Sequence, residues 1–356
     1  MGGYAWGLLL SILFLLVVTC SMSDDALQGI HHVSAVTGQA EANVRFYTQV
    51  LGLRLVTKTV NQDDPSSYHL FYGDETGSPG TDLTFFDVPQ ARAQRPGTGL
   101  ITGTSLRVRG REALRRWADR LDAHDVRRTP LHRRAGRAAF TLFDDEGQTI
   151  HLVDDADDAA RVPDTTPWGD GPVPVDWAIR GLGPVEVTVA DLGPTRRVLT
   201  EVFGFREGRA YEVEADAAEL DESIPTPSLS ATVFETGPGG VATELHVIER
   251  LDADRGWLGR GGVHHLALRT PNGDTIRRWQ ERITNAGLNP SPVIDRHYFE
   301  SVYTREPGGI LIEIATDTGT PFPVEEAAAG TVTLPPALEA QRDEIEAQLT
   351  PIGTGQ

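Results

Sequence analysis

The sequence predicts an α+β fold in which one βαβββ unit occurs four times. Two stretches, QGIHHVSAVT (residues 28–37) and GGVHHLALRT (residues 261–270), repeat the pattern of a His pair followed by alternating apolar residues. Each opening strand precedes an amphipathic helix, and each unit closes with a Gly turn and an apolar strand. Because a single unit of this size cannot bury both faces of its sheet, the units must pair.

The four units follow one another along the chain. Unit one runs from GIHHVSAVT through EANVRFYTQVLGLRLV to GSPGTDLTFFDV, and unit two runs from TGTSLRVRG through REALRRWADRLDAHDV to DDEGQTIHLVDD. Unit three runs from GPVEVTVAD through PTRRVLTEVFGFREG to GPGGVATELHVIE, and unit four runs from GGVHHLALRT through DTIRRWQERITNAGL to EPGGILIEIATD. In unit four, Ile276, Trp279 and Ile283 follow helical spacing, and Gly287 marks the end of the helix.

Composition divides the chain into five segments. We expect a hydrophobic N-terminal segment at residues 1–21, units one and two at residues 27–155, and units three and four at residues 179–320. Residues 156–178 are rich in Pro, Asp and Gly, and they are predicted to be a linker. Residues 321–356 form a tail whose Pro-Pro start and helical pattern predict a short helix packed on the body.

The hydrophobic segment WGLLLSILFLLVVTC (Trp6–Cys20) allows two interpretations. It is short for a membrane span, which needs about 20 apolar residues, and no basic residue precedes it as in a signal peptide. If translation starts at Met22, the segment is an upstream artefact and we expect a cytoplasmic protein. The alternative is a signal peptide, or a membrane anchor through residues 6–20.

Charge and cysteine content exclude several classes of function. The 356 residues include 51 acidic and 32 basic ones, which gives a net charge of −19. Such a surface repels phosphate backbones, so we expect no nucleic-acid partner. One cysteine, Cys20, excludes an intrachain disulfide and a cysteine metal cage. The acid-rich composition, with Lys58 as the single lysine, is typical of halophilic proteins.

The repeated His pairs predict a metal site. Alternation along a strand places Val263 and His265 on one face and His264 on the other, so one His of each pair faces a given side. Equivalent His residues meet if units one and four pair about a pseudo-twofold axis, which leaves unit two to pair with unit three. Glu313 lies inside the apolar run ILIEIA, where a carboxylate is costly unless it is paired or binds metal. Two His and one carboxylate suit non-haem Fe(II).

The closing Gly of each unit provides a common reference point for the strand that carries Glu313. Glu313 lies four residues after such a Gly, and the same offset gives Thr84 in unit one, His151 in unit two and Glu244 in unit three. Because unit one offers Thr84 there, a site with two acidic ligands from four strands is disfavoured. A second metal site could use His151, Glu244 and Glu186, but a degenerate remnant or simple polar pairing is the favoured interpretation.

Six stretches, which together span residues from about 28 to 350, resemble one known superfamily. They are GIHHVSAVTG, YHLFYGDETGSPGTDLTFF, AIRGLGPVEVTV, GGVHHLALRT, DRHYFESVYTREPGGILIEIATD and LPPALEAQRDEIEAQL. The fourfold βαβββ plan resembles the vicinal oxygen chelate superfamily, which includes glyoxalase and bleomycin resistance proteins. Within it, the chain is most similar to the hydroquinone-type, extradiol-like ring-cleaving dioxygenases.

The resemblance implies an Fe(II) enzyme, with Mn(II) as the alternative metal. The ligands that it implies are the second His of each pair and the strand carboxylate, namely His32, His265 and Glu313. It also places Arg296 and Tyr303 near the bound ring, where they would orient it and stabilise developing oxyanion charge. The competing interpretations are a surface charge for Arg296 and a core aromatic residue for Tyr303.

Four further histidines can be given an expected role or effect. The first His of each pair, His31 or His264, lies beside the metal in the family and serves in proton transfer or positioning. A β-bulge, or a role behind the ligands, would reconcile this placement with strand alternation. His69, in YHLFYG, is interpreted as a core or supporting residue, and His297 stands where the family often has Gly, which affects pocket shape and substrate.

The resemblance therefore implies a ring-cleaving dioxygenase that acts on hydroquinones, or as second choice on catechols, without an external reductant. Three protein ligands leave positions on the metal for a phenolic oxygen and for O2. One alternative is a glyoxalase-type or isomerase-type metalloenzyme, and another is a non-catalytic resistance protein that binds aromatic compounds. The expected partners are an aromatic small molecule and O2, and a homo-oligomer is left open.

Overall fold

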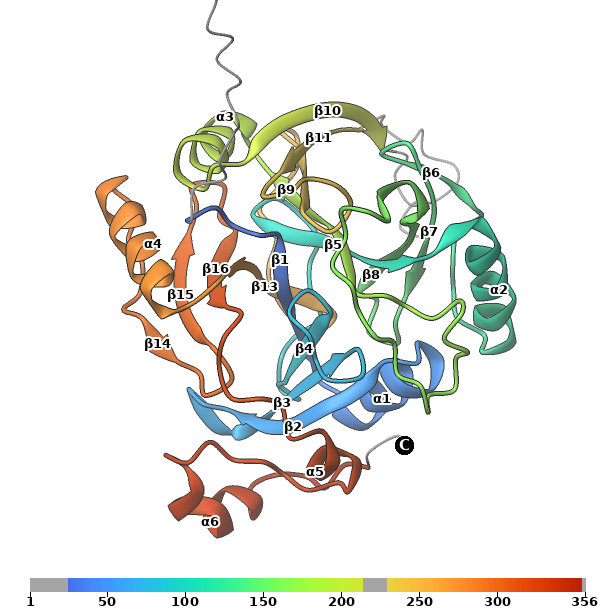
Figure 1. Ribbon diagram of the computed structural model, residues 1–356, viewed down its shortest axis with the longest axis vertical. Helices are drawn as coiled ribbons and strands as arrows, with labels where there is room; N and C mark the ends of the chain where they lie inside the picture. The colour runs from blue at the N-terminus through green and yellow to red at the C-terminus, as the bar shows by residue number, and fades with distance from the viewer. Residues whose placement is uncertain (1–24, 214–228, 354–356) are drawn as a thin grey trace, which may run out of the picture.

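The computed structural model describes residues 25–213 and 229–353, and within them the predicted unit occurs four times (Figure 1). Unit one contains β1 (Ile30–Thr37), α1 (Ala40–Arg45), β2 (Arg54–Asn61), β3 (Asp64–Gly73) and β4 (Asp82–Asp87). Unit two contains β5 (Leu100–Val108), α2 (Gly110–Ala123), β6 (His132–Arg134), β7 (Arg137–Phe143) and β8 (Thr149–Asp154). Unit three contains β9 (Leu182–Val189), α3 (Leu192–Arg197), β10 (Arg206–Val213), β11 (Leu229–Glu235) and β12 (Glu244–Glu249). Unit four contains β13 (Gly262–Thr270), α4 (Gly273–Asn285), β14 (Ile294–Asp295), β15 (Glu300–Arg305) and β16 (Leu311–Thr316).

The opening strands hold the four units together. β1 runs antiparallel to β13, and β5 runs antiparallel to β9, so unit one pairs with unit four and unit two pairs with unit three. Within a unit the last strand lies parallel to the first, as β4 does beside β1 and β16 does beside β13. The two halves join into one sheet because β13 also pairs with β5, at Val263 and Ile101. The predicted α+β fold and the predicted pairing of units are both confirmed.

The first His pair lies at a β-bulge in the contact between β1 and β13. Ile30 pairs with Leu268, and His32 pairs with the next residue of the partner strand, Ala267. His31 is therefore an extra residue on β1 that has no position opposite it. A bulge of this kind lets two neighbouring side chains turn toward the same region instead of pointing to opposite faces.

The second His pair lies at the matching bulge on the other strand. Ser34 pairs with His265 and Ala35 pairs with Val263, which leaves His264 as the extra residue on β13. The strict alternation predicted from the sequence is therefore wrong at this point. Val263 does not share the face of His265, because the bulge turns Val263 into the main hydrophobic core.

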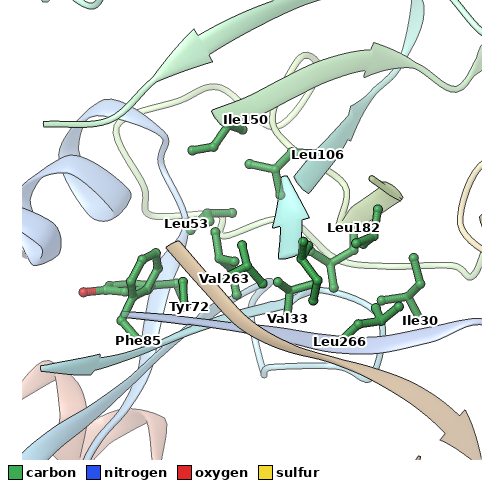
Figure 2. Packing of buried hydrophobic residues seen from close by; sticks show 14 of the residues in the cluster. Ile30, Val33, Leu53, Tyr72, Phe85, Leu106, Ile150, Leu182, Val263 and Leu266 are labelled. Carbon is green, nitrogen blue, oxygen red and sulfur yellow. The ribbon is translucent and has the colours of Figure 1, made fainter. Parts of the chain in front are cut away.

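The main core lies on the side of β1 and β13 that is remote from His32 and His265. Figure 2 shows how side chains from all four units gather in this core. Burial of each large aliphatic side chain contributes about 1.5–3 kcal/mol to folding. The residues labelled there are Ile30, Val33, Leu53, Tyr72, Phe85, Leu106, Ile150, Leu182, Val263 and Leu266.

Helix α4 forms as its sequence pattern predicts. The side chain of Asn272 accepts hydrogen bonds from the backbone N–H groups of Asp274 and Thr275, which caps the N-terminus of the helix. The residues predicted to face the core are buried, namely Ile276, Trp279 and Ile283. Gly287 follows the helix with φ of +79°, a conformation that glycine adopts without steric cost.

The connecting and terminal segments lie around this sheet. Between β8 and β9 the chain forms one short helical turn, at Ala156–Asp158, and is otherwise irregular. The C-terminal segment contains α5 (Val324–Ala328) and α6 (Arg342–Glu346) and runs beside β2 (Figure 1). The hydrophobic stretch at residues 6–20 lies outside the described residues. Among the helices of residues 25–213 and 229–353, none is long and apolar enough to cross a membrane.

Candidate metal centre

His32 on β1, His265 on β13 and Glu313 on β16 meet at one buried point. The Nε2 atoms of His32 and His265 lie 3.3 Å apart. Oε2 of Glu313 lies 3.2 Å from Nε2 of His32 and 2.9 Å from Nε2 of His265. The exposed fraction of each residue is 3% or less. Within the described part of the chain, no other group of His, Cys, Asp and Glu side chains brings three ligand atoms this close together.

The spacing of these three atoms fits a metal ion that is bound on one face by protein. Two ligand atoms at right angles, each about 2.1 Å from an ion, are about 3.0 Å apart. The observed separations of 2.9, 3.2 and 3.3 Å lie close to that value. Two His and one carboxylate in this arrangement leave the opposite face of the ion open to other ligands.

The carboxylate of Glu313 has one oxygen held by protein and one that faces the imidazoles. The hydroxyl of Ser301 donates a hydrogen bond to Oε1. Oε2 is buried and has no hydrogen-bond partner among the described residues. A buried carboxylate oxygen without a partner is costly, and a bound cation would remove that cost. The donor set and the unpartnered oxygen therefore both fit a metal ion.

The electrostatics of the site favour the protonation state that a metal needs. Burial alone would raise the pKa of Glu313, but the facing imidazoles of His32 and His265 outweigh burial and hold this pKa well below its ordinary value. Burial lowers the pKa of His265, so that its imidazole is neutral. An ionised carboxylate and a neutral imidazole can both donate a lone pair to a cation.

The bulged residues His31 and His264 lie directly behind the ligands. Nδ1 of His31 is 2.9 Å from Nδ1 of His32, and Nδ1 of His264 is 2.8 Å from Nδ1 of His265. Burial lowers the pKa of His31 and of His264 to about 3. Each neutral ring can therefore accept the Nδ1 proton of its neighbour, which leaves Nε2 of that neighbour free for a metal. The β-bulges thus provide the arrangement that strict alternation excludes.

A pocket of about 450 Å³, its open mouth included, lies over the two ligand imidazoles. Arg296 and Tyr303, which the family resemblance places near the bound ring, both line it. The guanidinium carbon of Arg296 is 5.4 Å from the centre of the Tyr303 ring, and its Nη2 atom pairs with Asp63 at 2.9 Å. The Tyr303 ring lies edge-on to His265, with 5.6 Å between ring centres. Burial raises the pKa of Tyr303, so its hydroxyl keeps its proton.

His69 also lines the pocket, whereas the prediction from the sequence was a core or supporting role. It lies on β3 between the rings of Phe71 and Phe86. Its Nε2 atom is 2.9 Å from Oγ1 of Thr84, the residue at the position of Glu313 in unit one. A weak signal for this role was present, because His69 belongs to the YHLFYG stretch that carries the family resemblance.

Units two and three carry the equivalent strands, and here one sequence alignment is wrong. Glu313 is the third residue of β16, and the third residues of β4 and β8 are Thr84 and His151, as the Gly alignment predicts. In unit three the third residue of β12 is His246, whereas Glu244 is the first. The turn that precedes β12 is two residues longer, so a fixed offset from the Gly points to the wrong residue.

The polar residues of units two and three pair with one another. Glu244 contacts Arg137 through two hydrogen bonds of 2.8 Å and contacts Nε2 of His246 at 2.9 Å. Glu186 forms an ion pair with Arg134. Arginine side chains thus neutralise both carboxylates that a second metal would need. This arrangement agrees with the favoured interpretation of a polar remnant.

His297 follows Arg296 and adopts a backbone conformation that favours glycine. Its φ is +71°, in the left-handed region that costs a non-glycine residue about 1–2 kcal/mol. Its backbone N–H donates to Oδ1 of Asp295, and its carbonyl accepts from Thr320. The Gly that the family often has at this position is therefore explained by backbone geometry, and the His side chain does not line the pocket.

Comparison with known proteins places the chain in a family. The family described as "Glyoxalase/Bleomycin resistance protein/Dioxygenase superfamily" matches residues 29–152 and residues 181–314. The chain belongs to this superfamily. The first matched segment ends within β8 and the second begins just before β9, so each covers nearly all of two of the four units. This superfamily membership agrees with the resemblance found in the sequence.

Several members of the superfamily are similar over nearly their whole length. The chain is 43% identical over 329 residues to the Bacillus subtilis (strain 168) protein named "Putative ring-cleaving dioxygenase MhqA", with 92% of this chain and 99% of the relative covered. It is 28% identical to the Sphingobium indicum protein named "Chlorohydroquinone/hydroquinone 1,2-dioxygenase", with 90% and 95% covered. A crystal structure of a "putative dioxygenase" from Bacillus subtilis has a TM-score of 0.78 and 32% identity, with 92% and 98% covered.

Proposed function

We propose that this protein is a non-haem Fe(II)-dependent ring-cleaving dioxygenase that acts on hydroquinones with O2. The observation that carries the proposal is the approach of Nε2 of His32, Nε2 of His265 and Oε2 of Glu313 to within 2.9–3.3 Å of one another. Two His and one carboxylate with an open face suit Fe(II), with Mn(II) as the alternative. The names of the two relatives support the reaction class, and the name of the Sphingobium indicum relative supports the choice of hydroquinone over catechol.

Fe(II) bound by His32, His265 and Glu313 would supply the path by which electrons pass from the aromatic ring to O2. The protein residues then have separable tasks. Tyr303 keeps its proton at neutral pH, because burial raises its pKa, and its hydroxyl can donate a hydrogen bond to a ring oxygen that loses its own proton. Arg296 lines the same pocket and adds a fixed positive charge beside that oxygen.

The positions of Arg296 and Tyr303 are themselves held by neighbouring groups. Asp63 pairs with the Arg296 guanidinium, and Tyr303 lies on β15 directly opposite Glu313 of β16. His31 and His264 fix the rings of the two His ligands from behind. Such support keeps the ring-binding and ligand atoms in one geometry, which lowers the entropic cost of bringing the reactants together.

The position of Thr84 argues against the glyoxalase-type alternative. A site with two acidic ligands would need a carboxylate at the third residue of β4, where this chain has Thr84. The Thr84 hydroxyl is within 2.7 Å of Oγ of Ser34 and within 2.9 Å of Nε2 of His69. Its hydrogen bonds are thus made to protein, and the donor set keeps one carboxylate.

The proposal is tested by O2 uptake with hydroquinone after loading of the protein with Fe(II) under nitrogen. We expect uptake by the wild-type protein and a loss of at least about 100-fold in His265→Ala and in Glu313→Ala, because each variant lacks a ligand. Iron content after gel filtration should fall in the same variants. Catechol, supplied in place of hydroquinone, tests the second choice of substrate.

Two matched controls separate loss of the metal from general damage. His132→Ala removes a half-buried imidazole whose Nδ1 atom contacts the carbonyl of Pro130, and Glu112→Ala removes an exposed carboxylate of α2. Both should keep wild-type uptake and iron content. Full turnover in His265→Ala and Glu313→Ala would show that the proposed metal centre is not the catalytic site.

A further inference from the structure

His69 is held rigidly in the wall of the pocket by a chain of two hydroxyl groups. Oγ of Ser34 lies 2.7 Å from Oγ1 of Thr84, and Oγ1 of Thr84 lies 2.9 Å from Nε2 of His69. The imidazole packs between Phe71 and Phe86, with ring centres 4.1 and 4.2 Å away. Both hydroxyl groups are buried, so neither can exchange this partner for bulk water.

The pseudo-twofold relation between units one and four shows which residues of unit four correspond to His69 and Thr84. In unit four, Ser301 pairs with the residue two places after Glu313 and hydrogen bonds to its carboxylate. In unit one, His69 pairs with the residue two places after Thr84 and hydrogen bonds to its hydroxyl. His69 and Thr84 are therefore the counterparts of Ser301 and Glu313. In unit four this pair belongs to the candidate metal centre, whereas in unit one its member His69 lines the pocket.

The hydrogen-bond chain fixes which nitrogen of His69 carries the proton. Each hydroxyl group donates one hydrogen bond. If Ser34 donates to Thr84 and Thr84 donates to Nε2 of His69, both hydroxyl protons have acceptors. If the chain runs in reverse, the Ser34 proton has no side-chain acceptor among the described residues. Both directions form the same two hydrogen bonds, but the first leaves the unpartnered donor on His69, which lines the pocket, and not on the fully buried Ser34. The first direction is therefore favoured, and it places the proton of the neutral ring on Nδ1.

His69 lines the same pocket as His32 and His265, but it does not belong to the group of side chains that meet at the candidate metal position. Thr84 already contacts its Nε2 atom, so Nδ1 is the ring nitrogen that is left for a ligand in the pocket. An aromatic compound that lies along this pocket with one oxygen at the metal can bring its second oxygen to His69. No hydrogen bond to Nδ1 of His69 occurs within residues 25–213 and 229–353.

We propose that His69 is a positioning residue that donates an Nδ1–H hydrogen bond to the second ring oxygen of the substrate. This inference rests on the proposed function and deepens it, because it explains why a hydroquinone would be preferred to a simple phenol. Different groups in the pocket then bind the two oxygens of the substrate ring. The metal, Arg296 and Tyr303 hold one oxygen, and His69 on the wall from unit one holds the other.

The test compares ligand binding in three proteins under nitrogen, where no turnover occurs. His69→Phe keeps a ring between Phe71 and Phe86 but lacks the N–H group, whereas His69→Asn places an amide N–H near the position of Nδ1. Calorimetric titration of the Fe(II)-loaded proteins uses 4-methoxyphenol, whose para oxygen only accepts, and 4-methylphenol, which has no para oxygen. We expect the wild-type protein to prefer 4-methoxyphenol by about two- to tenfold, as one neutral hydrogen bond allows.

In His69→Phe this preference should vanish, and in His69→Asn it should largely return. Hydroquinone turnover in air should show a KM raised several-fold in His69→Phe, with a smaller change in kcat and unchanged iron content. An unchanged preference in His69→Phe, or an equal loss in both variants, would overturn the proposal and leave His69 as a packing residue. Failure of the wild-type protein to consume O2 would instead refute the dioxygenase function, since the binding comparison needs no turnover.

Discussion

Ser301 donates its hydrogen bond to Oε1 of Glu313 and leaves Oε2 facing the two imidazoles of His32 and His265. One neutral hydroxyl thus decides which carboxylate oxygen is available to a cation. A hydrogen bond to the second oxygen of a ligating carboxylate restricts its rotation, and loss of such support typically lowers metal affinity by about 10–100-fold.

Replacement of Ser301 should therefore weaken metal binding without removing a ligand. We expect Ser301→Ala to lower Fe(II) affinity by about 10–100-fold, whereas Ser301→Thr, which keeps the hydroxyl, should stay near the wild-type value. Competition with a chromophoric chelator under nitrogen measures the affinity. Equal affinity in Ser301→Ala and the wild-type protein would mean that the carboxylate is oriented by its strand alone.

The core of Figure 2 should be sensitive to a loss of volume. Leu106 is fully buried there, at 0% exposure. Leu106→Ala should lower the free energy of unfolding by about 2–5 kcal/mol, because it removes buried methyl groups and leaves a cavity. Leu131→Ala, at a residue that is 40% exposed, serves as the control and should change it by less than about 0.5 kcal/mol. Urea denaturation measures both, and similar losses in the two variants would contradict the assignment of the core.

The backbone at His297 predicts a stabilising substitution. Because its φ is +71°, His297→Gly should relieve strain and raise the free energy of unfolding by about 0.5–1 kcal/mol, net of the extra chain entropy of glycine. His132→Gly, in the strand β6, should have the opposite sign. The melting temperatures of the two variants, each compared with that of the wild-type protein, check both predictions. A lower melting temperature in His297→Gly would show that contacts of the His side chain outweigh the backbone strain.

Asp144 predicts a pH dependence of stability at a place remote from the metal ligands. Burial raises its pKa from 3.8 to about 6, so between these values the folded protein holds a proton that the unfolded chain has lost. Stability from this residue is therefore present below pH 3.8 and is lost as the pH rises through 6. Asp144→Asn does not titrate, and its free energy of unfolding should fall less than that of the wild-type protein between pH 4 and pH 7. Urea denaturation of both proteins at pH 4 and at pH 7 measures this difference. An equal change in the free energy of unfolding in the two proteins would contradict the raised pKa of Asp144.

The units, their pairing and the three side chains that meet at the candidate metal centre could be predicted from the sequence, because each leaves a local signal. A His pair and a lone carboxylate in an apolar strand are visible without a structure, as at Glu313. The strand pattern alone did not show the β-bulges, because an extra residue in a strand depends on the partner strand and leaves no pattern of its own. Only the family resemblance suggested a bulge, as one of two explanations for the placement of His31 and His264. The face of Val263 was therefore predicted wrongly from strand alternation.

The length of one turn and contacts between strands of the same unit account for the remaining differences. A Gly offset found Thr84 and His151 but missed His246, because the length of a turn is free to vary while the strand register is not. His69 was undervalued because its importance lies in the hydroxyl chain to Ser34, and that chain exists only once β3, β4 and β1 lie side by side. Side-chain roles that depend on three strands cannot be read from any one of them.

The bond between His31 and the carbonyl of Thr316 joins positions that are 285 residues apart in the chain. A ribosome must therefore release β16 before β1 acquires its permanent surroundings, and β1 spends most of translation without them. A metal ion held by all three side chains would consequently be bound by the finished polypeptide, not by the nascent one. His32 near the beginning of the chain meets Glu313 only after β16 has left the ribosome, so the candidate metal centre is assembled at the end of synthesis.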